Sequence, residues 1–130
     1  HGGAVRSRFG LAVAEQCLRG EELRGCHQAA LLRLRRRALR ERAAARLAWL
    51  DLRRRCLENL QDSKGASALA EKQRKILTEL QQEQAEIQHL QNIYKAAHQE
   101  RKLLLKHQRE ILMMQRSTAQ LQEELNNLTG

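Results

Sequence analysis

Apolar residues recur along most of the chain at intervals of three and four, which is the spacing of one face of an α-helix. No proline interrupts the pattern, and residues that favour helices (Ala, Leu, Glu, Gln, Lys and Arg) dominate it. The pattern predicts an all-α protein that forms a long antiparallel helical hairpin or coiled coil with an extended C-terminal helix. Its core is expected to be a thin seam between helices.

Glycines and one polar stretch divide this pattern into four segments. Between Gly20 and Gly25 we expect a break or kink, because each glycine costs about 1 kcal/mol relative to alanine inside a helix. Gly65 is expected to close one helix in the left-handed conformation, and Ser67 is expected to cap the next. The predicted segments are an N-terminal flexible segment with a short helix at 1–25, an arginine-rich helix at 26–61, a turn at 62–67 and a long coiled-coil helix at 68–130.

The two main predicted helices differ in length. At 1.5 Å per residue, the helix at 26–61 would be about 54 Å long and the helix at 68–130 about 90 Å. In a hairpin folded at Gly65, the far end of the second helix would therefore lack a partner. Either residues 11–19 continue along it, or another protein does.

Large apolar residues trace the predicted seam between the helices. Trp49, the only tryptophan, is expected to pack near residues 76–87, so that Trp49→Ala would cost about 3–5 kcal/mol if the ring is internal. Arg101 and Gln108 also fall at seam positions, where polar residues weaken a coiled coil but set its register. The predicted seam residues are Trp49, Leu50, Leu57, Ile76, Leu80, Ile87, Leu90, Tyr94, Leu104 and Ile111.

Positive charge is concentrated in the first half of the chain. The formal net charge is +9, and residues 1–60 hold 14 arginines, no lysine and 6 acidic residues. Residues 61–130 are nearly balanced, with 10 basic and 9 acidic residues. Such an asymmetry indicates an acidic partner surface.

The arginines are the strongest chemical feature of the sequence. Four of them fall at i, i+3, i+4 and i+7, which forms one stripe on a helix, and others repeat the interval further along. Some are expected to pair with Glu79, Glu83 and Glu86 of the neighbouring helix, but three carboxylates cannot neutralise ten guanidinium groups. The predicted acidic-surface binding residues are Arg33, Arg36, Arg37, Arg40, Arg46, Arg53 and Arg54.

No pattern in the sequence predicts an enzyme, a metal site, a cofactor or a small-molecule substrate. Successive members of the series His89, His98 and His107 point to nearly opposite sides of one helix, so they cannot share an ion. The three cysteines lack disulfide-framework spacing and are expected to be buried or half-buried thiols. No run approaches 18 apolar residues, so no membrane span is predicted.

Two acidic polymers compete as partners of the arginines: nucleic acid and the microtubule, whose surface is acidic. Nucleic-acid binders often stack bases on aromatic side chains, which this chain almost lacks. A basic-zipper protein would follow its basic region with a regular leucine heptad, whereas this seam contains Arg101 and Gln108. Nucleic acid is therefore the less favoured partner, although composition alone leaves the choice open.

An ordered series of short motifs resembles a known family. The motifs are LAWLD at 47–51, EKQR at 71–74, LQQEQAEI at 80–87, AAHQERKLLLK at 96–106 and STAQLQEEL at 117–125. In this order they resemble the helical region of the centrosome-associated protein 350 family, over about residues 30–125. The short connection at 62–67 and the pair Met113-Met114 favour the smaller member of that family.

The resemblance implies a cytoplasmic, cytoskeletal protein of the centrosome, basal body or ciliary axoneme that associates with microtubules and anchors other factors. It implies no enzymatic activity and carries no defined set of binding residues. Three hypotheses follow: a microtubule scaffold that docks its basic helix on tubulin or another ciliary or centrosomal protein, a coiled-coil adaptor without tubulin contact, and a nucleic-acid-binding helix pair.

Overall fold

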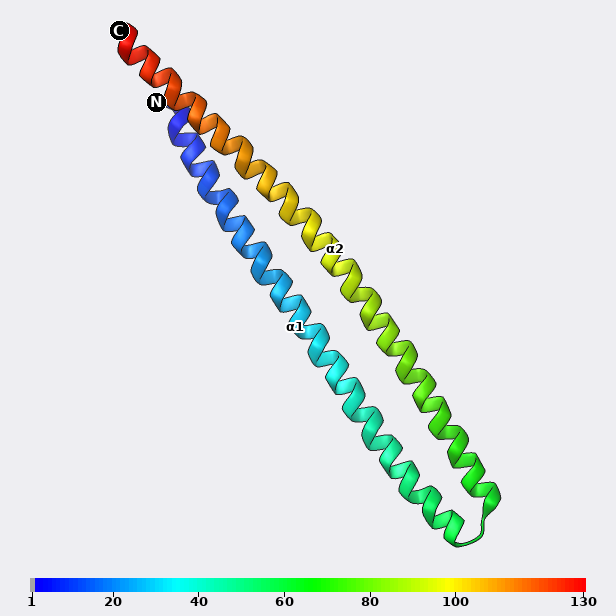
Figure 1. Cartoon of the computed structure of the whole chain (residues 1–130). Coiled ribbons are helices and arrows are strands. Elements are labelled where there is room, and N and C mark those ends of the chain that lie inside the picture. The colour runs from blue at the N-terminus through cyan, green and yellow to red at the C-terminus, as the bar shows by residue number, and fades with distance from the viewer. Residues whose placement is uncertain (1) are drawn as a thin grey trace. The chain divides into compact units, whose positions relative to one another are not determined.

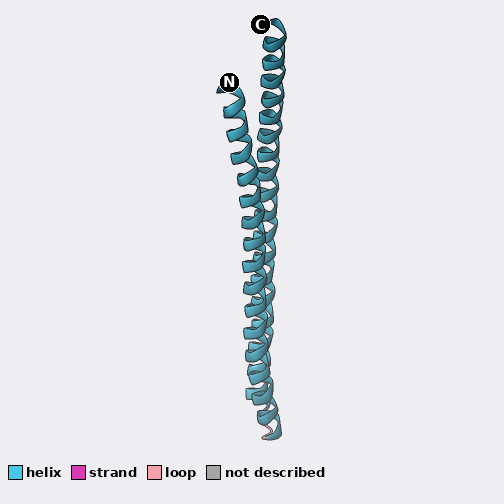
Figure 2. Ribbon diagram, turned by 90° about the vertical axis from the view of Figure 1, so that its left-hand side faces the viewer, coloured by secondary structure: helices cyan, strands magenta, loops and turns pink. Residues whose placement is uncertain are grey.

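Two helices make up nearly all of the chain in the computed structural model, which describes residues 2–130, with side chains from residue 8 onward (Figure 1). Helix α1 spans Gly2–Asn59 and helix α2 spans Ser63–Thr129. Figure 2 shows helix and one short loop in the described part of the chain, without strands. The prediction of an all-α helical hairpin is confirmed. The predicted N-terminal flexible segment at 1–25 begins with His1, which lies outside the described residues, and α1 starts at Gly2.

The connection between the helices is tighter than predicted, and Gly65 does not close it. The left-handed residue is Gln61, with a φ of 61°. The Gln61 N–H donates to the Glu58 carbonyl oxygen at 3.0 Å, and the Asp62 N–H donates to that of Leu57 at 2.9 Å. These two bonds form the Schellman arrangement that satisfies the last carbonyl groups of a helix. Helix α1 therefore ends at Asn59 through its own backbone.

Asp62 begins the second helix directly after this closure. Its carboxylate oxygen Oδ1 accepts a hydrogen bond from the Gly65 N–H at 3.0 Å, as an N-terminal capping residue does. The predicted cap at Ser67 is thus wrong, because an aspartate five residues earlier satisfies the free N–H groups. Gly65 lies inside α2 instead, where an added Cβ would stand 2.6 Å from Asp62 Oδ2.

The part of the chain around this connection, Ala29–Ile93, forms one compact unit, here called the hairpin unit. Its core is the seam between the two helices. Ile87 is the most deeply buried of its side chains, at 2% exposure. Each buried leucine or isoleucine contributes roughly 1.5–3 kcal/mol, so a single row of such contacts holds the unit together. Two clusters of buried residues form this core: Ala43, Leu50, Leu69 and Ile76 in one, and Leu32, Leu39 and Ile87 in the other.

The second compact unit, here called the terminal unit, combines His1–Gln28 with Tyr94–Gly130. Leu11, Ala14 and Leu18 of α1 are buried in it. Gly10 faces Leu112 of α2, so residues near the start of α1 do continue along the second helix. Of the two possibilities raised by the unequal lengths of the predicted helices, the structure thus shows the one in which residues near the start of the chain pack along the second helix. The last ten residues of α2 are exposed.

Helix α1 runs without a break through Gly20 and Gly25, so the predicted kink is absent. Packing of Leu18 and Glu21, which are buried on either side of Gly20, offsets the helix-weakening effect of that glycine. Gly25 also has a positive role in the interface. An added Cβ there would stand 2.8 Å from His98 Cε1, whereas one at Gly20 would meet no atom within 4 Å.

Two further features bear on the sequence predictions. All three cysteines, Cys17, Cys26 and Cys56, are exposed rather than buried, because none falls on the face of α1 that packs against α2. Within the described residues, neither helix contains a segment that is both long enough and apolar enough to span a bilayer.

The contrast between the two glycines of α1 leads to a prediction. Gly20→Ala should raise the free energy of unfolding by up to about 1 kcal/mol, because alanine favours the helix and nothing obstructs its methyl group. Gly25→Ala should lose this gain or reverse it, since the methyl group displaces the His98 ring. Thermal unfolding followed by circular dichroism measures both. Equal stabilisation by the two substitutions would show that the close approach at Gly25 has no energetic consequence.

Candidate functional site

The candidate site is the arginine-rich surface of the hairpin unit. This unit contains 14 basic and 8 acidic residues, and ten of the basic residues are arginines of α1 between Arg33 and Arg55. Leu39 marks the seam-facing side of α1. Helical geometry places Arg36 and Arg40 on one side of Leu39, and Arg35 and Arg42 on the other. The predicted stripe is therefore not divided: Arg33, Arg36 and Arg40 share one flank of the hairpin, while Arg46 lies with Arg35 and Arg42 on the other.

On one flank, arginines of α1 face glutamines of α2. Arg36 donates to Gln88 Oε1 at 3.1 Å and to Gln91 Oε1 at 2.9 Å, and Arg54 donates to Gln73 Oε1 at 3.3 Å. A glutamine satisfies these N–H groups without neutralising their charge. We call this surface the Arg–Gln flank; its members are Arg33, Arg36, Arg40 and Arg54 with Gln73, Gln88 and Gln91.

On the other flank, arginines face glutamates across open grooves. One groove of about 290 Å³ runs beside the buried Leu39 and Ile76, and a second of about 600 Å³ runs beside Leu39 and Ile87. No ion pair within 4.0 Å joins the two sets among the residues that the structure describes. The expected pairing of arginines with Glu79, Glu83 and Glu86 is therefore wrong for the described residues, which line shared grooves without an ion pair. We call this surface the Arg–Glu groove; it contains Arg35, Arg42 and Arg46 with Glu79, Glu83 and Glu86.

The remaining arginine contacts lie within α1. Arg37 pairs with Glu41 at 3.0 Å on an exposed surface. Arg54 and Arg55 both pair with Asp51 at 3.1 Å. Arg54 also lies 3.7 Å from a further carboxylate, that of Glu58. By contrast, Arg33, Arg40 and Arg46 make no ion pair with any described residue.

Trp49 does not pack in the seam, so its predicted burial is corrected. Its side chain is 57% exposed, whereas the neighbouring Leu50 is buried. One residue rotates the side-chain direction by about 100° around a helix, so both cannot face α2. The guanidinium carbon of Arg53 lies 5.1 Å from the centre of the Trp49 ring, at a cation–π distance.

The other predicted seam residues divide at the boundary between the two units. In the hairpin unit, Ile76 and Ile87 are buried with Leu50, and Leu57, Leu80 and Leu90 pack against the same clusters. In the terminal unit, the predicted residues are exposed, because different residues of α2 face α1 there. The exposed ones are Tyr94, Leu104 and Ile111.

A polar cluster occupies the seam of the terminal unit, and sequence reasoning missed its central residue. Glu21 is 4% exposed, and its Oε1 accepts from Arg101 Nε at 2.8 Å and lies 3.0 Å from His98 Nδ1. Glu22 pairs with Lys102 beside it. Glu21 continues the spacing of Leu11, Ala14 and Leu18, which is the signal that identifies it in retrospect. Arg101 does lie at the interface.

The environment of Glu21 favours its charged form. Burial alone would raise the pKa of this carboxyl group, but the hydrogen bonds from Arg101 and His98, together with the charges of Arg101 and Arg24, outweigh burial and hold the pKa below 4.5. The hydrogen bond from Lys102 likewise lowers the pKa of Glu22. The ionised Glu21 carboxylate and its partners on α2 therefore hold the two helices together in the terminal unit. Among the described residues, no group of three or more potential ligands is placed to hold a metal ion.

Comparison with known proteins supports the resemblance predicted from the motifs. The chain is 43% identical over 121 residues to a segment of centrosome-associated protein 350 of Mus musculus. The match covers 93% of this chain but only 4% of that protein's length. No family model matches the chain, and no solved structure matches it. The chain is thus a helical region similar to a small part of a long centrosome-associated protein.

The different positions of Trp49 and Leu50 lead to a prediction about stability. Leu50→Ala should lower the free energy of unfolding by about 2–5 kcal/mol, because it removes buried contacts from the seam. Trp49→Ala should lower it by at most about 1 kcal/mol, since the ring is mostly exposed and contacts mainly Arg53. Urea unfolding followed by far-ultraviolet circular dichroism compares the two. A larger loss for Trp49→Ala would mean that the ring is internal after all.

The Glu21 cluster leads to a prediction about pH. Because the folded state lowers the pKa of Glu21, its contribution to stability is complete above about pH 4.5 and is lost as the pH falls through the folded pKa. Glu21→Gln should lower stability at pH 7 by about 1–3 kcal/mol and flatten the dependence of stability on pH between 7 and 3. The exposed Glu15 on the same helix provides the control, Glu15→Gln, which should leave the slope unchanged. Parallel slopes for the native chain and Glu21→Gln would contradict this account.

Proposed function

We propose that this region similar to centrosome-associated protein 350 is a non-enzymatic structural scaffold of the centrosome that docks its basic hairpin on the acidic surface of microtubules. The name of the relative supports a centrosomal role. The proposal goes beyond that name in two respects: docking to tubulin, and a location that includes the basal body or the ciliary axoneme. Other centrosomal or ciliary proteins are the alternative occupants of the same surface.

The observation that carries the proposal is the uncompensated charge of the Arg–Gln flank. Arg33 and Arg40 have no carboxylate partner among the described residues, and Arg36 is satisfied by two neutral glutamines. Guanidinium groups bind carboxylates through two parallel hydrogen bonds, so free ones on a rigid helix suit a carboxylate-rich surface. Nearby Arg37 pairs only with Glu41 on an exposed surface, a weak pair that an external carboxylate can replace.

The architecture supports a structural role more than a catalytic one. The hairpin unit is a single seam with open grooves along it, and its exposed charges are held on continuous helices rather than on loops. Catalytic acids and bases normally work in pockets that exclude water and shift their pKa values. Rigid helices instead suit the repeated presentation of charge to an extended partner.

Microtubule co-sedimentation tests this proposal with matched variants of the 130-residue chain. Arg33, Arg37 and Arg40 changed together to glutamine should weaken binding about tenfold, as expected for three exposed charge pairs. Arg36 is kept because its bonds to Gln88 and Gln91 join the helices. The control changes Arg19, Lys95 and Lys106 to glutamine, which removes the same charge from exposed positions of the terminal unit. The control should pellet like the native chain.

The other outcomes identify the alternatives. Equal weakening by both triple variants would mean that net charge alone attracts the chain to microtubules. If the native chain stays in solution while circular dichroism shows intact helices, direct contact with tubulin is wrong and the chain is a protein–protein adaptor. Tighter, strongly salt-dependent binding to duplex DNA or to RNA would favour the nucleic-acid-binding helix pair.

A further inference from the structure

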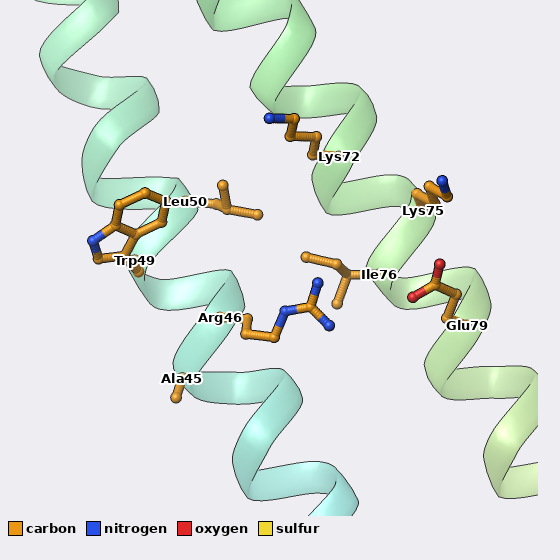
Figure 3. Close-up of a pocket in the computed structure, with 8 residues that line it drawn as sticks. All are labelled: Ala45, Arg46, Trp49, Leu50, Lys72, Lys75, Ile76 and Glu79. Atoms are coloured by element: carbon orange, nitrogen blue, oxygen red, sulfur yellow. The ribbon is translucent and has the colours of Figure 1, made fainter.

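A groove beside Trp49 in the hairpin unit combines an apolar floor with a basic rim (Figure 3). Its volume is about 600 Å³, enough for one or two large side chains of a bound peptide. Both helices contribute to it, since the lining comes from two turns of α1 and two turns of α2. The lining residues are Ala45, Arg46, Trp49, Leu50, Lys72, Lys75, Ile76 and Glu79.

The apolar part of the groove is already organised by the core. Leu50 and Ile76 are buried and packed together, so the groove floor is rigid. Trp49 stands beside them with more than half of its surface exposed, and Arg53 lies against its ring. Exposed aromatic side chains on a rigid surface are the residues that most often dominate binding energy in protein interfaces.

The rim of the groove is positively charged. Arg46, Lys72 and Lys75 line it with a single acidic residue, Glu79, and none of the three cations is ion-paired to a described residue. Arg46 and Arg53 are seven residues apart on α1, or about 10 Å along the helix axis, and Trp49 lies between them. That distance matches about three residues of an extended peptide. The charges thus suit acidic side chains on both sides of a central apolar one.

We infer that this Trp49 groove binds an acidic peptide segment of a partner protein, with one large apolar side chain seated between Trp49 and Ile76. Carboxylates of the peptide pair with Lys72 and Lys75 on one helix and with Arg46 on the other. The inference goes beyond the proposed docking to microtubules. It uses the opposite flank of the hairpin from Arg33 and Arg40, and it requires an apolar anchor that a purely acidic surface does not provide.

Trp49 itself reports on the groove, because it is the only tryptophan of the chain. The probes are two heptapeptides with blocked ends, each with three glutamates on either side of a central residue, which is leucine in one and glycine in the other. The leucine peptide should shift the Trp49 emission to shorter wavelength in a saturable manner. Its affinity should exceed that of the glycine peptide by about tenfold or more, since burial of a leucine side chain supplies the difference.

Variants of the whole chain separate the groove from general charge attraction, with fluorescein-labelled peptide and anisotropy as the readout. Trp49→Ala and the double change of Lys72 and Lys75 to glutamine should each weaken the leucine peptide at least tenfold. Leu34→Ala, which alters another exposed apolar residue of α1, should leave binding unchanged. So should the triple change of Arg33, Arg37 and Arg40, so a failure of microtubule docking leaves this test intact.

Three results would overturn the inference. One is equal affinity for the leucine and glycine peptides, which would remove the apolar anchor. Another is undiminished binding by Trp49→Ala when circular dichroism shows a native helix content. The third is equal weakening by the Arg33, Arg37 and Arg40 change and by the Lys72 and Lys75 change, which would reduce the effect to diffuse electrostatic attraction.

Discussion

The packing of one helix face against another is the constraint on which the whole molecule depends. With only two helices, each described unit has one seam, and every residue outside that seam is left in contact with solvent. In the hairpin unit the seam is apolar, from Leu32 to Ile87. In the terminal unit the seam combines buried apolar residues, Leu11, Ala14 and Leu18, with a charged cluster around Glu21. At each turn of a helix, the residues that face the seam therefore determine stability, and the remaining residues determine the chemistry of the surface.

This constraint explains how the hairpin presents its charge. A two-helix seam has two flanks, and here the residues opposite the arginines differ between them. Glutamines stand opposite Arg36 and Arg54, while glutamates share the groove with Arg42 and Arg46. A helix with arginines on both sides thus acquires one flank of high positive charge and one of mixed charge. The difference in charge between the two flanks comes from residues of α2, although the arginines that carry the positive charge belong to α1.

Much of this arrangement could be predicted from the sequence, and the failures share a physical cause. The hairpin, its approximate connection and the buried Leu50, Ile76 and Ile87 follow from apolar periodicity and the absence of proline. The predicted burial of Trp49 is wrong because its neighbour Leu50 already fills that turn of the seam, so the large apolar ring lies outside it. Past Tyr94, the predicted seam residues Leu104 and Ile111 are exposed, and His98 and Arg101 of α2 contact Glu21 of α1. The capping by Asp62 and the left-handed Gln61 depend on backbone geometry that periodicity does not describe.

The tight connection at Gln61 and Asp62 also has a consequence for the order in which the chain folds. Arg54 and Gln73, near the connection, are only 19 residues apart, so their meeting closes a short loop. Glu21 and Arg101 are 80 residues apart, and their contact demands a far larger loss of chain entropy unless the intervening helices are already paired. Folding is thus expected to nucleate at the connection and to proceed outward, with the terminal unit assembling last and opening first. A partner that binds the hairpin unit would then contact the region that folds first. A partner that binds the terminal unit would contact the region that unfolds locally most often.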